Sequence, residues 1–159
     1  MRSIRTAVPL LLGFAVGILP GSAGAQVNTV TCQPSSSITA PAPRVVAAQG
    51  TTTCSAAVDM SQEIEINLDV PLVEVGSVQV GPLSTALARD TASCDACTTL
   101  GVATSYGNAI PGLRYESEYV VVIRAPAGTR VTGGPGCFGL GPFTPGQMIC
   151  GQERTVTAR

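Results

Sequence analysis

The first 25 residues have the pattern of a secretory signal peptide, and this pattern constrains the fold more than any other feature of the chain. Arg2 and Arg5 provide a positively charged start, an apolar stretch follows over residues 7–19, and Ala-Gly-Ala at 23–25 fits the rule for cleavage before Gln26. The apolar stretch is shorter than the roughly 20 residues that span a bilayer. We therefore expect a chain exported to the bacterial periplasm, the cell surface or the extracellular space, where cysteines are oxidised.

Cleavage at this point leaves residues 26–159, which are 159 − 25 = 134 residues and enough for one domain with its own hydrophobic core. We expect a single β domain preceded by a flexible N-terminal arm over residues 26–43. Seven arginines then face ten carboxylates, so the mature net charge is 7 − 10 = −3. A mildly acidic chain without a basic stripe predicts no nucleic-acid partner, and only the transient signal peptide is expected to meet a membrane.

Histidine, lysine and tryptophan are absent from the sequence. Histidine is the usual proton carrier near neutral pH and the commonest metal ligand, so hydrolases built on a histidine base are excluded. Without lysine, Schiff-base chemistry and phosphate-binding P-loops are excluded as well. Chemistry by carboxylates alone and calcium binding through oxygen ligands survive this filter. We expect no catalytic residue, no cofactor and no metal.

Two segments have the alternating pattern of a strand with one buried face. In residues 63–70 the side chains of Ile64, Ile66, Leu68 and Val70 share one face, and polar side chains share the other. Residues 115–124 alternate in the same way, and their second half is apolar on both faces, which is typical of a strand that crosses the middle of a domain. Such alternation predicts an antiparallel sheet.

The rest of the chain is divided by glycine and proline into shorter elements. The composition predicts a first strand over 27–32, a linker or loop over 33–43, a hairpin of 44–48 with 51–58 around Gln49-Gly50, a strand over 73–80 with a bulge at Gly76, a short helix within 83–90, and short strands over 129–132 and 155–158. Together these elements predict an all-β fold: a disulfide-stabilised antiparallel β-sandwich of immunoglobulin-like or pilin-like architecture, with at most one short helix.

The cysteine count is even, which in an exported chain predicts three disulfides. Proximity along the chain favours the pairs Cys32–Cys54, Cys94–Cys97 and Cys137–Cys150, although six cysteines allow 15 pairings. The Cys-x-x-Cys spacing of Cys94 and Cys97 also permits a redox dithiol. Asp95 between them disfavours a thiolate and no strand–helix frame surrounds the motif, so a structural loop clip is the favoured interpretation.

Three further features are candidates for binding or chemistry. The glycine-rich segment 133–146 carries Phe138, Leu140 and Phe143 and is either a loop tucked against the core edge or an exposed apolar recognition loop. Glu63, Glu65 and Asp69 resemble a solvated strand face more than the carboxylate pair of a glycosidase. The N-terminal strand can pair with a neighbour's sheet edge or within its own domain.

These observations favour a non-catalytic exported structural or binding module, which assembles with a protein partner or with itself through sheet edges or the 133–146 loop. The alternative is an extracytoplasmic enzyme or thiol-redox protein that uses carboxylates or the Cys94/Cys97 pair.

Overall fold

A computed structural model describes residues 28–69, 73–75, 78–80, 86–141 and 146–159. The predicted signal peptide and its cleavage site lie outside the described residues, as does Phe143. Within the described ranges, the chain contains no helix of the length and apolar character needed to cross a membrane.

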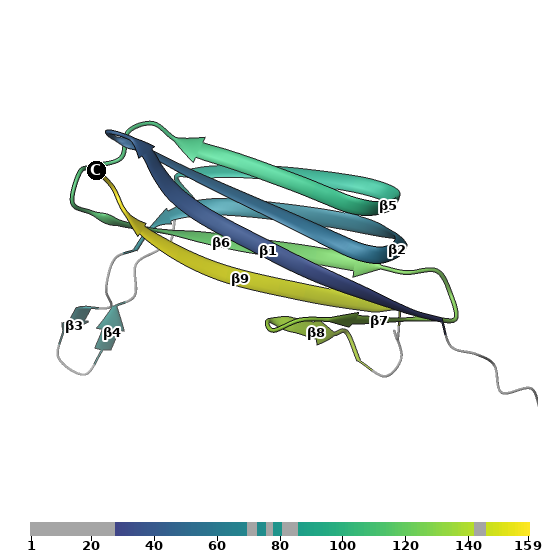
Figure 1. The fold of residues 1–159 in the computed structure, drawn as a ribbon. Coiled ribbons are helices and arrows are strands. Elements are labelled where there is room, and N and C mark those ends of the chain that lie inside the picture. The colour runs from purple at the N-terminus through teal and green to yellow at the C-terminus, as the bar shows by residue number, and fades with distance from the viewer. Residues whose placement is uncertain (1–27, 70–72, 76–77, 81–85, 142–145) are drawn as a thin grey trace, which may run out of the picture.

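The described residues fold almost entirely into β-strands, as predicted (Figure 1). The strands are β1 (Asn28–Ala42), β2 (Val45–Leu68), β3 (Val73–Val75), β4 (Val78–Val80), β5 (Ala88–Tyr106), β6 (Arg114–Arg124), β7 (Thr129–Gly133), β8 (Cys137–Gly139) and β9 (Gln147–Thr157). A seven-stranded sheet has the order β7-β1-β2-β6-β9-β8, and β5 pairs with the other edge of β2. Among the described strands, only the contact between β1 and β7 is parallel; β3 and β4 form a separate antiparallel pair.

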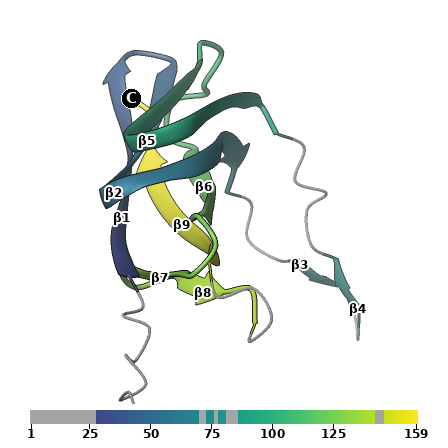
Figure 2. The same ribbon diagram turned by 90° about the vertical axis from the view of Figure 1, so that its right-hand side faces the viewer.

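Strand β2 organises this sheet because three strands pair with it. Its first half pairs with β1, its second half pairs with β6, and β5 lies along nearly its full length on the opposite edge. Such a long strand must bend to serve both partners, and the sheet curls with it (Figure 2). A single, nearly barrel-shaped sheet therefore takes the place of the two distinct layers expected of a sandwich.

Side chains close the curled sheet between β1 and β9. Gln152 on β9 donates from Nε2 to the Pro34 carbonyl at 3.0 Å, and the Ser36 hydroxyl donates to Gln152 Oε1 at 3.0 Å. Arg154 adds a third contact from Nε to the Ser36 carbonyl at 3.4 Å. No backbone ladder joins these two strands in the described residues, so one glutamine supplies both a donor and an acceptor across the seam.

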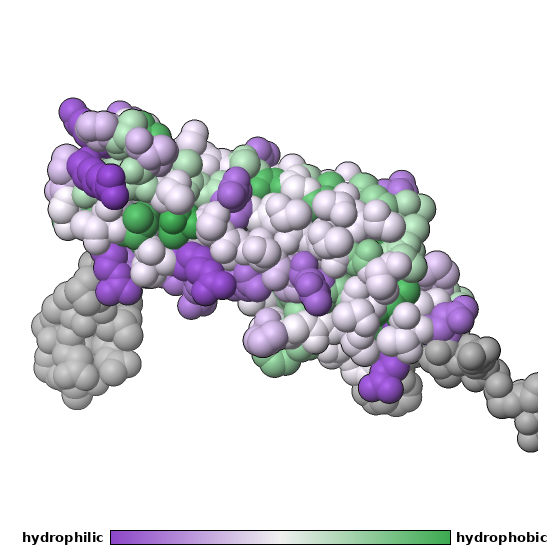
Figure 3. Space-filling view, viewed as in Figure 1, coloured by the Kyte–Doolittle hydropathy of each residue, from purple (hydrophilic) through white to green (hydrophobic). Residues whose placement is uncertain are grey.

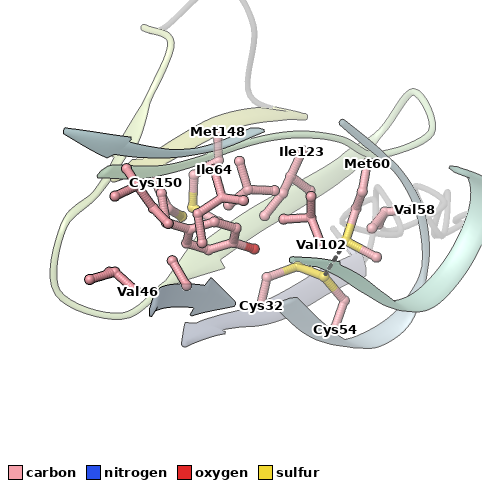
Figure 4. Close-up of a cluster of buried hydrophobic side chains, with 14 of the residues drawn as sticks. Cys32, Val46, Cys54, Val58, Met60, Ile64, Val102, Ile123, Met148 and Cys150 are labelled. Atoms are coloured by element: carbon pink, nitrogen blue, oxygen red, sulfur yellow. Dashed lines mark hydrogen bonds between the residues drawn. A yellow bond between two sulfur atoms is a disulfide. The ribbon is translucent and has the colours of Figure 1, made fainter. Parts of the chain in front are cut away.

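The core lies inside the curl and is built from alternate residues of the long strands (Figure 4). Ile64 and Ile66 on β2 are fully buried, as their alternation predicts, and so are Tyr119, Val121 and Ile123 on β6. Central β6, paired with β2 on one side and β9 on the other, confirms the prediction for this strand. Burial of these side chains is the main favourable contribution to folding.

Tyr119 is, with Tyr115, one of the two largest side chains buried in this core. Its ring lies directly against the backbone of Gly50 on β2, where any Cβ atom would collide with the ring. A hydrogen bond of 2.7 Å joins the Tyr119 and Thr52 hydroxyls, so the buried polar end of the ring is satisfied. Burial is also the larger influence on the phenol and raises the pKa of Tyr119 to about 12.

The predicted linker and hairpin in the first third of the chain are wrong. Residues 33–42 continue β1, and residues 45–58 belong to the uninterrupted strand β2. Pro34 fits a strand here because the edge of β1 away from β2 has no backbone partner among the described strands at that point, so the missing N–H breaks no ladder. The hairpin turn falls at Pro43-Arg44, where Arg44 has a positive φ of 62°, and Gly50 is used for close approach to Tyr119 instead.

Other elements differ in extent from the predicted ones. The expected single strand over 73–80 is two strands, β3 and β4, paired with each other, and the expected bulge at Gly76 falls outside the described residues. The expected helix within 83–90 is wrong where it can be judged, because Ala88 to Asp90 begin β5; residues 83–85 are outside the described part. Strand β7 matches the prediction for 129–132, whereas β9 begins at Gln147, well before the predicted 155.

All three predicted disulfides are present. Cys32–Cys54 joins directly opposite residues of β1 and β2, and Cys137–Cys150 does the same for β8 and β9. Each of these two bridges is therefore set by strand register. Cys94–Cys97 lies within the single strand β5.

The contact between Gly50 and Tyr119 predicts a strong asymmetry between two glycine substitutions. Gly50→Ala should destabilise the fold by about 1–3 kcal/mol, because the ring is held by Thr52 and cannot move freely away. Gly101→Ala is the matched control on the neighbouring strand, since its added Cβ meets nothing closer than 3.8 Å. Urea unfolding measures both free energies, and equal values for the two variants would contradict the packing described here.

Candidate functional site

The free edge of β5 is the most prominent unpaired feature of the described fold. This strand of 19 residues pairs with β2 on one side, and no described strand pairs with its other side (Figure 1). A row of backbone N–H and C=O groups therefore faces outward, which is the structure that accepts an added strand. The sequence analysis missed β5, although the β-branched and aromatic residues of 98–106 were a usable signal.

A bulge divides this edge into two unlike parts. Cys97 pairs with Val58 and Cys94 with Met60, so two residues of β5 stand opposite the single residue Asp59. Ala96 in the bulge has a φ of 51°, unusual for a residue with a side chain. The Ala96 N–H donates to Asp59 Oδ1 at 3.0 Å. The Cys94–Cys97 disulfide spans the two bulged residues, Asp95 and Ala96.

Charge differs across the bulge. Arg89, Asp90 and Asp95 lie on its N-terminal side or within it, whereas no charged residue occurs from Ala96 to Tyr106. Charged side chains are a common way to protect an open edge from unwanted pairing. The protected part of β5 is therefore its first half, and the second half is left open to pairing.

The Cys94–Cys97 pair has the surroundings of a clip more than those of a redox centre. Asp59 and Asp95 are its nearest charged neighbours along the two strands, and negative charge disfavours the thiolate that dithiol chemistry requires. The pair lies on a strand rather than at the N-terminus of a helix. These contacts support the structural interpretation of the motif.

The outward face of β1, β2 and the second half of β5 carries only uncharged side chains in its cross-strand rows. Its cross-strand rows are Gln33–Thr53–Thr99, Ser35–Thr51–Gly101, Ser37–Gln49–Ala103 and Thr39–Ala47–Ser105. A shallow hollow of about 360 Å³ lies over the last two rows. Figure 3, which views the side that includes β1, shows a broad pale area of intermediate hydropathy. This face carries small uncharged side chains right up to the open edge.

The described residues of the 133–146 segment lie at the other end of the long strands from this hollow (Figure 1). Phe138 is 72% exposed and Leu140 is 46% exposed, so the expectation that Phe138 packs into the core edge is wrong. Phe138 belongs to the short strand β8, and its cross-strand partner is Ile149 on β9. An interaction role for Phe138 and Leu140 stays a prediction, and Phe143 is not among the described residues.

Carboxylates line the outward face of β2, β6 and β9. Glu65, Glu118 and Glu153 are direct cross-strand neighbours in one row, which the sequence analysis did not foresee because it depends on register. Arg89 forms ion pairs with both Glu63 and Glu65. At the other end of this face Arg114 Nε lies 2.8 Å from Asp69 Oδ2.

These ion pairs determine what the carboxylates can do. The candidate residues Glu63, Glu65 and Asp69 each form an ion pair with an arginine at the surface. Among the described residues, no group of three or more His, Cys, Asp or Glu side chains is arranged to hold a metal ion. The face resembles an ion-paired surface more than a pair of carboxylates around a substrate.

No protein-family model matches the chain, and neither a curated protein nor a solved structure with significant similarity to it was found.

The carboxylate face predicts a pH effect that depends on Glu116. Partial burial raises the pKa of this carboxyl above its ordinary value of 4.5, and Glu153, Asp69 and Glu118 raise it further against the opposing charge of Arg114. A raised folded-state pKa means that the folded state binds this proton more tightly than the unfolded state. The contribution is therefore favourable below the ordinary value and is lost as the pH rises through the folded-state pKa.

Glu116→Gln should consequently melt at a higher temperature than the parent protein at pH 7, and the two should melt together below about pH 4. Asp95→Asn, on the exposed bulge of β5, is the control and should show no such pH-dependent gain. Thermal unfolding followed by circular dichroism across this pH range makes the comparison. A Glu116→Gln variant that is less stable at pH 7 would contradict the proposed repulsion.

The disulfides should differ in their reaction with a dithiol. Cys32, Cys54 and Cys150 are buried, with exposed fractions of 0%, 5% and 0%, whereas Cys94 and Cys97 are both half-buried on the edge strand. Brief treatment of the folded protein with dithiothreitol, alkylation and mass spectrometry should label Cys94 and Cys97 first. Labelling of Cys32 or Cys54 at the same rate would show that the edge bridge is no more accessible than the bridges of the core.

Proposed function

We propose that the mature chain is a non-catalytic structural or binding module of the periplasm, the cell surface or the extracellular space, and that it engages a protein partner by strand addition at the β5 edge. The open edge of β5 is the observation that carries the proposal. The signal-peptide pattern and three disulfides support an oxidising destination. The lack of histidine and lysine supports a role without covalent chemistry.

The open half of β5 is well suited to strand addition for two reasons. Its backbone groups already lie in the geometry of a sheet, since residues Thr99 to Tyr106 pair in unbroken register with β2. A partner strand therefore pays little to order this side of the interface. Its side chains alternate between an outward row of small residues and an inward row that includes Leu100, Val102 and Tyr106. The backbone of an added strand can therefore reach the backbone of β5 without obstruction by large outward side chains.

The enzyme or thiol-redox alternative has less support. Glu63, Glu65 and Asp69 are engaged by arginines, and the Cys94–Cys97 pair is flanked by Asp59 and Asp95. The ion pairs favour a structural role for the carboxylates over a catalytic one. The neighbouring negative charges favour a stable Cys94–Cys97 disulfide over a reactive dithiol.

A strand tethered to the protein tests the edge directly. The Arg159 carbonyl accepts a hydrogen bond from the Arg44 N–H at 3.1 Å, and Val46, two residues beyond Arg44, pairs with Tyr106. The C-terminus thus lies near the end of β5. A copy of residues 98–106 attached to Arg159 by a Gly/Ser linker of about ten residues, with a reach of about 17 Å, starts beside Tyr106 in the antiparallel direction.

Hydrogen exchange monitored by mass spectrometry should show that the tethered strand slows exchange over Cys97–Tyr106 by about tenfold or more, because tethering supplies a high effective concentration. The control tether carries proline at the positions copied from Leu100 and Val102 and cannot form the ladder. Equal exchange with the two tethers would overturn the proposed function. Slower exchange over Ala88–Cys94 instead would place the pairing site on the wrong side of the bulge.

A further inference from the structure

We propose that the partner of the β5 edge is a second copy of this chain, paired antiparallel through Thr98–Tyr106 about a twofold axis at Val102. This inference rests on the proposed strand addition and names its partner. It makes the protein a symmetric dimer whose two sheets join edge to edge.

The bulge and the charges set the limits of the pairing segment. Ala96 and the Cys94–Cys97 bridge distort the strand at one end, and Tyr106 is the last residue of β5 at the other. Thr98–Tyr106 is the stretch of nine residues between these limits, and Thr99–Tyr106 within it pairs with β2 in unbroken register. Val102 is its midpoint, so a twofold axis there pairs every residue of the stretch, and any slip in register leaves residues unpaired.

The segment is its own complement when it is turned about this axis. The facing pairs are Thr98–Tyr106, Thr99–Ser105, Leu100–Thr104 and Gly101–Ala103, with Val102 opposite itself. No pair brings like charges together, and none contains proline. Threonine, valine and tyrosine have high strand propensity and pair favourably across strands. A strand from another protein would have to be equally free of charge and proline and equally prone to form a strand, whereas a second copy of this chain has these properties by symmetry.

The inner side of β5 gives the dimer apolar contact in addition to backbone bonds. Val102 is buried, while Leu100 and Tyr106 are only half-buried at the edge although they pack against the core. A neighbouring strand would cover their open sides. An antiparallel ladder over this segment is about 30 Å long and supplies about nine backbone hydrogen bonds, which is within the range of about 5–15 found in stable protein interfaces.

The outer side offers no obstacle to the same arrangement. Outward residues Thr99, Gly101, Ala103 and Ser105 are exposed and small. The uncharged rows of β1, β2 and β5 would continue across the axis into the same rows of the second copy. The dimer would thus carry one continuous six-stranded face, with the shallow hollow beside Ser105 repeated once in each copy.

Two matched double variants test both the partner and the register. In the proposed dimer Thr99 faces Ser105 of the second copy, and this contact occurs twice. T99K/S105K places lysine opposite lysine in both contacts, whereas T99E/S105K places glutamate opposite lysine in both. Neither pair of positions has a charged cross-strand neighbour within its own chain, because Thr99 pairs with Thr53 and Ser105 with Ala47. Both variants should therefore fold alike, which circular dichroism checks.

Sedimentation equilibrium of the mature protein, residues 26–159 with its disulfides intact, gives the dissociation constant. We expect a dimer, with a dissociation constant that T99K/S105K raises by about tenfold or more and that T99E/S105K leaves within a fewfold of the parent value. A parent protein that stays monomeric at its highest soluble concentration overturns the second-copy partner. If the tethered strand protects β5 in that case, strand addition itself still holds. Equal dissociation constants for the two variants overturn the register about Val102.

Discussion

Backbone pairing along β2 is the constraint on which the rest of the molecule depends. Its residues bond β1 and then β6 on one edge and β5 on the other, so the registers of three strands are set against one strand. Register decides which side chains meet, because a slip of one residue moves every side chain to the opposite face. The burial of Tyr119 against Gly50, the Cys32–Cys54 bridge and the row of carboxylates from Glu65 all follow from it.

The same constraint explains why one edge stays open. Strands β1 and β9 approach each other around the curl and are joined by Gln152 and Arg154, so that side of the sheet is closed. Strand β5 lies on the other edge of β2 and has no described strand beyond it (Figure 2). The edges of β1 and β9 are therefore joined to each other, whereas the outer edge of β5 stays open. The Cys94–Cys97 bulge and three nearby charges leave only part of that edge available.

Sequence alone predicted the elements whose pattern is local. Alternation identified the strand ends at Ile64–Leu68 and the whole of β6, and chain proximity identified all three disulfides. It failed over residues 33–58 because proline and glycine were interpreted as breaks. In the fold Pro34 lies where no ladder bond is needed, and Gly50 makes room for a tyrosine that comes 69 positions later in the sequence. Neither reason is visible in a local window.

The sequence by itself determined that the chain is rich in strands, that its six cysteines can pair with near neighbours, and that histidine and lysine chemistry is excluded, because each depends on residue type and local spacing. Only the tertiary structure decided which strands are neighbours. That choice made the sheet curl, exposed Phe138 and placed Glu118 between Glu65 and Glu153. It also left the outer edge of the uncharged half of β5 without a partner among the described strands. Strand order arises from contacts between residues far apart in the chain, and periodicity carries no information about them.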